Sequence, residues 1–135
     1  MPTWLFKEEP THYGFDRFVK DGRTTWSGVK NALAQKHLRS VKKGDRILYY
    51  HTGDEKAVVG TATAAGHAYP DPGDPSGQAY IVDIVPAKRL ARPVTLAEIK
   101  ASPVFDDFDL VKMSRLSVMP VSAAHLREIE KRGRG

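Results

Sequence analysis

One stretch of this sequence combines an aromatic side chain, a glycine and a polar amide, which together can bind a flat heterocycle. Residues 24–31 read Thr-Thr-Trp-Ser-Gly-Val-Lys-Asn. If the indole of Trp26 keeps one face open beside Gly28, a nucleobase can stack on it for about 1–3 kcal/mol. The alternative is a core tryptophan. Asn31 can recognise a base edge with its amide, or cap the helix that follows.

A second candidate site lies at the end of a predicted strand, in the sequence Tyr49-Tyr50-His51. Side chains alternate along a strand, so Tyr49 and His51 share one face and Tyr50 points to the other. The strand ends of a small barrel open onto its mouth, where ligand-binding groups collect. A histidine there either contacts a heterocycle or is a structural residue whose hydrogen bonds are satisfied within the protein.

Arg115 and Ser117 form a third candidate site. Leu116 and Val118 take the core face of a predicted strand, which leaves Arg115 and Ser117 on the opposite face. If that face lines a cavity, the planar guanidinium of Arg115 suits a carbonyl or a phosphate. If it faces water, Arg115 is an ordinary surface residue, and alternation alone does not choose between the two.

Positive charge is concentrated just after the tryptophan stretch. The chain has a formal net charge of +5 and a pI of about 9.5. A basic domain favours polyanionic partners, because neutralising phosphates releases counterions. Many basic proteins bind no nucleic acid, so this charge alone makes DNA or RNA only a candidate partner. The cations that would contact phosphates are Lys30, Lys36, Arg39, Lys42 and Lys43.

The sequence argues against several enzyme classes. It contains no cysteine, and its histidines show no i, i+4 pairing, so a zinc site is not expected. It has neither a Gly-x-Ser-x-Gly elbow nor a phosphate loop ending in Gly-Lys-Ser/Thr. Asp106, Asp107 and Asp109 are interpreted as a solvated acidic turn rather than a divalent-metal site. We expect a non-catalytic binding module with no metal and no cofactor.

The elements that must position these residues alternate irregularly between strand and helix. Strands are predicted over residues 3–6, 46–51, 58–64 and 80–85 and around 116–118. Helices are predicted over residues 15–19 (ended by Gly22) and 31–39, from the Thr95–Glu98 capping box, and after Ser122. Residues 69–77, rich in proline and glycine, are predicted to form a loop. This order favours an α+β fold around a curled sheet or small barrel over a doubly wound nucleotide fold.

Length and hydropathy are those of one soluble domain. The chain of 135 residues can bury a core without disulfides. No apolar run approaches the roughly 18 residues of a membrane span, and early acidic residues argue against a signal peptide. The absence of cysteine fits a reducing compartment. We expect a single monomeric domain over residues 1–135, located in the cytoplasm and not in a membrane.

Seven short stretches, in the same order along the chain, resemble the EVE domain of the PUA-like superfamily. The resemblance spans residues 4–129, almost the whole chain. Each stretch alone is weakly specific, but seven in register are highly specific. They are WLFKEEP (residues 4–10), TWSGVKN (25–31), KGD (43–45), YHT (50–52), YPD (69–71), RPVTL (92–96) and SRLSV (114–118).

This resemblance implies a PUA-like curled or closed β-barrel of about five to six strands flanked by short helices. The related YTH domains hold a methylated adenine in an aromatic cage, and EVE domains are similarly regarded as readers of modified bases. Carried over to matching positions, the resemblance makes Trp26 the stacking wall of a base pocket. The base would be surrounded by Asn31, Tyr50, His51, Arg115 and Ser117, with Lys7 reaching the mouth.

Glu8 departs from the family pattern, because many members have a serine or threonine at this position. Its carboxylate can accept a hydrogen bond from an exocyclic amine, or it can form a salt bridge outside the pocket. The loop after Tyr69-Pro70-Asp71 is also shorter here than in many members.

The leading hypothesis is a non-catalytic nucleic-acid-binding module that reads a modified, flipped-out base in an aromatic pocket beside a basic helix. Two alternatives belong to other classes. One is an enzyme acting on nucleotides or RNA, with Glu8 or His51 as the general base. The other is an adaptor whose pocket binds a small molecule or a protein tail, which predicts that binding depends only weakly on salt.

Overall fold

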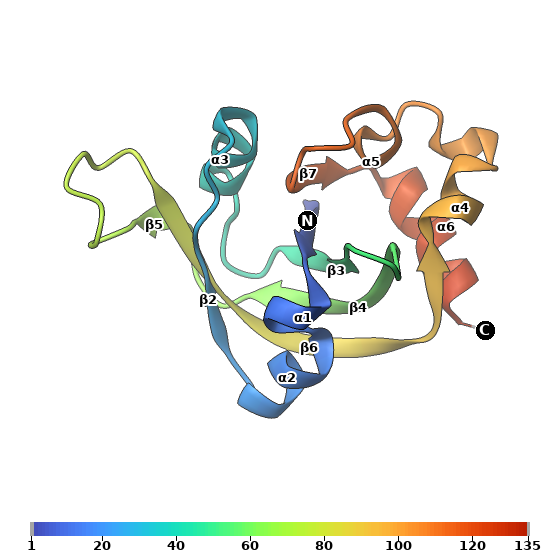
Figure 1. Cartoon of the computed structure of the whole chain (residues 1–135), viewed down its shortest axis with the longest axis horizontal. Coiled ribbons are helices and arrows are strands. Elements are labelled where there is room, and N and C mark those ends of the chain that lie inside the picture. Colours follow the sequence, from blue (N-terminus) through green and yellow to red (C-terminus); the bar gives the residue numbers. More distant parts are fainter. Residues whose placement is uncertain (1, 135) are drawn as a thin grey trace.

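The fold is built around one strongly curled sheet, which a computed structural model describes within residues 2–134 (Figure 1). Neighbouring strands follow the order β2-β6-β4-β3-β1-β7, and β5 pairs with β6 outside this path. The strands are β1 (Thr3–Glu8), β2 (Thr24–Trp26), β3 (Arg46–His51), β4 (Ala57–Ala64), β5 (Tyr69–Pro70), β6 (Tyr80–Thr95) and β7 (Val118–Val121). The helices are α1 (Pro10–Tyr13), α2 (Phe15–Asp21), α3 (Ala32–Arg39), α4 (Leu96–Lys100), α5 (Asp109–Lys112) and α6 (Ala123–Gly133), with a 3-10 turn η1 (Pro103–Phe105).

The expected α+β class with a curled sheet flanked by short helices is confirmed (Figure 1). The described sheet has seven strands rather than five or six. The additional strands, β2 and β5, have three and two residues, too few for alternation to reveal them. Because β2 and β7 lie at opposite ends of the strand path, the sheet forms a half-barrel instead of closing.

Strand β1 is hydrogen-bonded on both sides, in parallel to β3 and antiparallel to β7. At its carboxyl end Lys7 lies opposite Tyr50 of β3, and Glu8 lies opposite His51. Successive side chains of a strand point to opposite faces of the sheet. Lys7 and Tyr50 therefore lie on one face of the sheet, and Glu8 and His51 lie on the other.

Strand β6 runs over Tyr80–Thr95, far beyond the predicted residues 80–85. Its second half gives little pattern, because only Leu90 and Val94 are buried there, four residues apart. Pro86 and Pro93 also disguise it. Within residues 2–134 this half pairs with β4 alone, so one edge of the strand is free and can hold proline without losing ladder hydrogen bonds.

The last strand also begins later than predicted, at Val118. Leu116 is buried as expected but precedes the strand. The backbone of Ser117 already contacts β1, since its carbonyl accepts a hydrogen bond from the Lys7 N–H at 2.9 Å. Arg115 thus lies in the loop between α5 and β7.

Helix boundaries follow the caps predicted from the sequence. The side chain of Asn31 accepts the Ala34 N–H at the start of α3, and Ser122 caps α6 in the same way. Gly22 ends α2 with a φ of 75°, a left-handed conformation that suits glycine. These caps are confirmed. Helix α2 packs through Phe15 and Phe18, which are fully buried, whereas 49% of Val19 is exposed.

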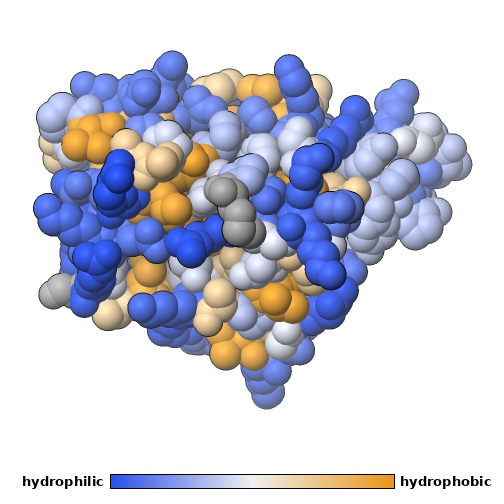
Figure 2. Space-filling model, turned by 180° about the vertical axis from the view of Figure 1, so that it is seen from behind, coloured by the Kyte–Doolittle hydropathy of each residue, from blue (hydrophilic) through white to orange (hydrophobic). Residues whose placement is uncertain are grey.

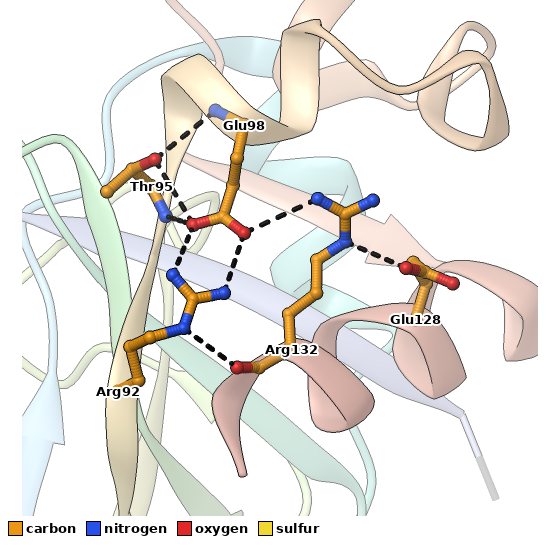
Figure 3. A network of polar contacts seen from close by, with 5 residues as sticks. All are labelled: Arg92, Thr95, Glu98, Glu128 and Arg132. Carbon is orange, nitrogen blue, oxygen red and sulfur yellow. Dashed lines mark hydrogen bonds and ion pairs between the residues drawn. The ribbon is translucent and has the colours of Figure 1, made fainter. Parts of the chain in front are cut away.

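Glu98 is the centre of a polar network that joins β6, α4 and α6 (Figure 3). Its carboxylate accepts two hydrogen bonds from Arg92, at 3.0 and 2.9 Å, and one from the Thr95 N–H at 3.0 Å. The Thr95 hydroxyl accepts the Glu98 N–H in return, so the predicted capping box is confirmed. Arg132 of α6 reaches Glu98 at 3.4 Å and also pairs with Glu128. These donors, Arg92 foremost, lower the pKa of Glu98 to about 2.

The surface is largely polar. Seen from behind, charged and polar residues cover most of the molecule, and apolar residues lie in separate patches (Figure 2). None of the helices within the described residues has the length and apolar character needed to cross a membrane.

The contact between Phe15 and Gly60 supplies a test of the core. A Cβ added at Gly60 would lie 2.3 Å from the end of the fully buried Phe15 ring. We expect Gly60→Ala to lower the free energy of unfolding by about 1–3 kcal/mol, because the ring must move and α2 with it. Gly66→Ala is the matched control, since open space surrounds Gly66, and should change stability by less than about 0.5 kcal/mol. Urea unfolding measures both, and equal effects would contradict the packing described.

The Glu98 network should make stability depend on pH. The pKa of the Glu98 carboxyl group falls from an ordinary 4.5 to about 2 in the folded chain. Its contribution to the free energy of unfolding is therefore complete above pH 4.5 and is lost as the pH falls toward 2. We expect Glu98→Gln to cost about 1–3 kcal/mol near pH 6 and much less near pH 2.5. Glu130→Gln, which removes one partly exposed ion pair with Arg46, is the control and should cost less than about 1 kcal/mol. A Glu98→Gln deficit that does not shrink in acid would refute this account.

Candidate functional site

The end of β1 separates two pockets, one on each face of the sheet. Glu8 lines a cavity of about 230 Å³ together with Trp26, which we name the Trp26 pocket. Lys7 lines another of about 270 Å³ together with Tyr50, which we name the Tyr50 pocket. The resemblance places Trp26 and Tyr50 around one base with Lys7 at its mouth, whereas in the structure Trp26 and Glu8 line one pocket and Lys7 and Tyr50 line the other.

Trp26 lies in strand β2 and is mostly buried, with 6% of its surface exposed. Its ring centroid is 5.2 Å from that of Phe6 and 5.5 Å from that of Tyr49. The predicted indole with a widely open face is therefore not present. Most of the side chain packs in the core, and the small accessible part belongs to the pocket wall.

Glu8 lies inside the Trp26 pocket, a position that the sequence alone does not decide. One carboxylate oxygen accepts the Glu9 N–H at 2.9 Å and lies 3.2 Å from Nδ1 of His12. The side chain is 22% exposed, so part of it remains accessible to a ligand. The remaining capacity of the carboxylate makes it a hydrogen-bond acceptor on the wall next to Trp26.

Sequence reasoning missed the helical side of this pocket. Tyr13 of α1 and Arg17 of α2 line it, with the Arg17 guanidinium carbon 5.4 Å from the centre of the Tyr13 ring. The Tyr13 hydroxyl donates a hydrogen bond to Asp21 at 2.7 Å. The pKa of Tyr13 is raised, mainly by burial and secondly by this hydrogen bond. Tyr13 and Arg17 lie beside Trp26 only because the sheet is curled. Their spacing in the sequence does not predict this proximity. The other lining residues are His12, Thr24, Thr25 and Ser27.

His51 is a structural residue that connects three segments. Its Nε2 accepts the backbone N–H of Phe15 at 3.0 Å, so its Nδ1 carries the proton and donates to Glu55 at 2.6 Å. Only 8% of His51 is exposed. Both ring nitrogens are occupied within the protein, so contact of His51 with a base, or a role as general base, stays a prediction that requires one of these two bonds to open.

Asn31, Arg115 and Ser117 lie outside the walls of both pockets. The side-chain oxygen of Asn31 caps α3, and its side-chain NH₂ group takes no part in this cap. Asn31 is an exposed residue. Arg115 is exposed, and Ser117 is joined to β1 through its backbone. Contacts of these three residues with a ligand stay predictions.

The cations predicted to contact phosphates are all exposed, on α3 and in the segments before and after it. Arg39 is partly held in place, since it donates to the Gln78 carbonyl at 2.6 Å and lies 5.1 Å from the centre of the Tyr80 ring. The other members of this group are Lys30, Lys36, Lys42 and Lys43.

Two aspartates of the acidic stretch have structural roles. Asp107 lies 3.0 Å from Nε2 of the buried His125, and Asp109 begins α5. Among the described residues, no group of three or more histidines and carboxylates is placed to hold a metal ion.

Comparison with known proteins places this geometry in a family. The EVE domain family matches residues 2–132. Human thymocyte nuclear protein 1 is 30% identical over 124 residues, which cover 73% of this chain and 55% of that protein. The chain thus spans about half the length of this relative.

Solved structures agree with this match. Rpa0253 from Rhodopseudomonas palustris is 43% identical, with a TM-score of 0.93 over 98% of this chain and 93% of its own. The human THYN1 protein in complex with 5-methylcytosine-containing DNA has a TM-score of 0.88 at 22% identity, covering 100% and 99% of the two chains. The YTH domain of Zygosaccharomyces rouxii MRB1 in complex with N6-methyladenosine RNA shares the fold, with a TM-score of 0.63 at 17% identity over 99% and 87%. The half-barrel is therefore PUA-like, and this chain belongs to the EVE domain family.

Proposed function

We propose that this chain is a non-catalytic reader that holds one flipped-out, modified base of DNA or RNA in the Trp26 pocket. The observation that carries the proposal is the position of Glu8, a carboxylate acceptor on the pocket wall beside the accessible part of Trp26. A cavity of about 230 Å³ is smaller than the roughly 300–1,000 Å³ of sites for drug-sized ligands. It suits one ring system better than a whole nucleotide.

Glu8 favours a base with an exocyclic amine. A carboxylate accepts hydrogen bonds and donates none, so it pairs with the amine of cytosine or adenine and repels the carbonyl of thymine or uracil. The bases in the names of the two nucleic-acid complexes, 5-methylcytosine and N6-methyladenosine, both carry such an N–H. The modified bases named in these complexes thus have the chemistry that Glu8 would select.

The free energy that holds an extruded base would come mainly from hydrogen bonds. Flipping costs a few kcal/mol, and least for a single-stranded or damaged base. Because most of the Trp26 ring is covered, contact with it supplies only part of the roughly 1–3 kcal/mol of a fully stacked base, whereas hydrogen bonds to a charged group add about 1.5–3 kcal/mol each. Phe6 and Tyr49 hold the Trp26 ring in place, so no ordering of the wall has to accompany binding.

Phosphate contacts would come from both sides of the pocket. Arg17 lines the cavity on the helical side. On the other side lie Lys30 and the exposed cations of α3, which follow Trp26 in the sequence. A strand crossing the opening would meet positive charge before and after the flipped base.

Replacing Glu8 should change base preference. We expect Glu8→Gln to weaken binding of single-stranded oligonucleotides containing one 5-methylcytosine or N6-methyladenine by about tenfold, since the charge-assisted hydrogen bond is lost. Binding of the same oligonucleotide with thymine should change much less. Fluorescence anisotropy measures the three affinities. Glu9→Gln, one residue away and outside the pocket wall, is the control. An equal loss for all three bases would show that Glu8 does not read the amine.

Removing surface cations should change the salt dependence of binding without changing base preference. For the double variant Lys36→Gln, Lys42→Gln we expect the slope of log K against log salt to fall by about 0.7–0.9 for each phosphate that is no longer neutralised. Lys131→Gln on α6, across the molecule from α3 in Figure 1, should leave the slope unchanged. A weak salt dependence of the unchanged protein would favour an adaptor that binds a small molecule or a protein tail.

A further inference from the structure

The Tyr50 pocket lies on the face of β1 opposite the Trp26 pocket and has its own chemistry. We infer that it is a second binding site, which holds a phosphate group between Lys7, Lys56 and Lys100 and the hydroxyl of Tyr50.

Charge is the first argument for this site. Three of the residues that line the pocket are lysines, and none is acidic. Two carboxylates near its rim, those of Glu9 and Glu55, are already engaged. Glu9 accepts a hydrogen bond from Thr52 at 3.2 Å, and Glu55 is bonded to His51. The pocket therefore presents three positive charges to an anion with no carboxylate on its wall.

Lys7 enters this pocket from β1 and is partly buried. Its ammonium donates to the Ser114 carbonyl at 3.0 Å and lies 5.8 Å from the centre of the Tyr50 ring. An ammonium has three donors, so two remain for a ligand. Burial lowers the pKa of Lys7, and an anion beside it would compensate for the lost hydration.

Tyr50 forms the inner wall and is 2% exposed. Within residues 2–134 its hydroxyl has no hydrogen-bond partner in the protein, unlike the hydroxyl of Tyr49, which donates to the Tyr13 carbonyl. Burial raises the pKa of Tyr50 to about 12, so the hydroxyl keeps its proton near neutral pH. It is thus a donor available to a phosphate oxygen.

Lys56 has an unusual backbone conformation. Its φ is 46°, and it is the only non-glycine residue of the described chain with a positive φ. A side chain is strained in this region, whereas glycine adopts it freely. Residues in such conformations cluster at ligand sites, and the lysine here brings its side chain to the pocket that Lys7 and Lys100 line.

Two sources could supply the phosphate. One is the backbone of the strand whose base enters the Trp26 pocket, since Lys7 and Glu8 are adjacent in β1. In that case the inference rests on the proposed function. The other is a free phosphorylated molecule, for which the site stands independently of any flipped base.

Titration of the ¹⁵N-labelled chain with inorganic phosphate, at constant ionic strength, tests the site by NMR. We expect saturable shifts of the amides of Gly53, Lys56 and Ser114, and about tenfold weaker phosphate binding in Lys56→Gly and in Lys100→Gln. Lys56→Gly suits the positive φ, so its unfolding midpoint should match or exceed that of the unchanged protein. Lys112→Gln is the charge-matched control, because Lys112 is an exposed residue of α5 that does not line the pocket.

A mononucleotide and an unmodified oligonucleotide then identify the source. If the pocket variants weaken binding of phosphate and of both nucleotides, the ligand is a strand phosphate. If the oligonucleotide is unaffected, the ligand is a free phosphorylated molecule. Trp26→Phe should leave the phosphate shifts unchanged, so failure of the base pocket does not affect this test. The absence of saturable shifts, or an equal loss in Lys112→Gln, would overturn the inference.

Discussion

Hydrogen bonding of β1 to β3 on one side and to β7 on the other is the constraint on which the rest of the structure depends. A strand fixed on both edges cannot rotate, so each side chain is committed to one face. Glu8 is thereby directed toward Trp26 and Lys7 toward Tyr50. Shifting the register by one residue would exchange the carboxylate and the ammonium and would put the wrong charge in both pockets.

The burial of Trp26 limits how the proposed reader would recognise a base. A freely exposed indole would bind any base by stacking, with little selectivity. Here Phe6 and Tyr49 cover most of the ring. In the proposed function, selectivity would therefore come from the polar wall around the accessible part, above all from Glu8. The same arrangement ties the pocket to the core, since Tyr49 also packs on Phe15 and Phe18.

Much of the fold could be predicted from the sequence, and the reasons are local. The caps at Asn31, Thr95 and Ser122 and the helix end at Gly22 are short-range features, and all were predicted correctly. The second half of β6 was missed, because its exposed side is polar and prolines interrupt it. The α+β class followed from the order of elements, whereas the number of strands depended on pairs too short to recognise.

The site was predictable only in part, because it is assembled over long distances. The resemblance assigned Trp26 and Tyr50 to one base pocket, whereas the two residues line separate cavities. Which face each occupies depends on register with a strand some forty residues away. His51 shows the same limit, since its partner Phe15 belongs to a helix whose position no spacing reveals.

The seating of Phe15 on Gly60 has a consequence for how this domain can diverge. The ring fills the volume where a side chain at residue 60 would lie, and helix α2, which carries Arg17 to the pocket rim, is docked through that contact. Because interiors are packed as densely as crystals, the two positions share a fixed volume. Across an alignment of relatives they should therefore covary, with a larger residue at one accompanied by a smaller residue at the other. A substitution at residue 60 would then move α2, and with it the side chain of Arg17 at the mouth of the pocket.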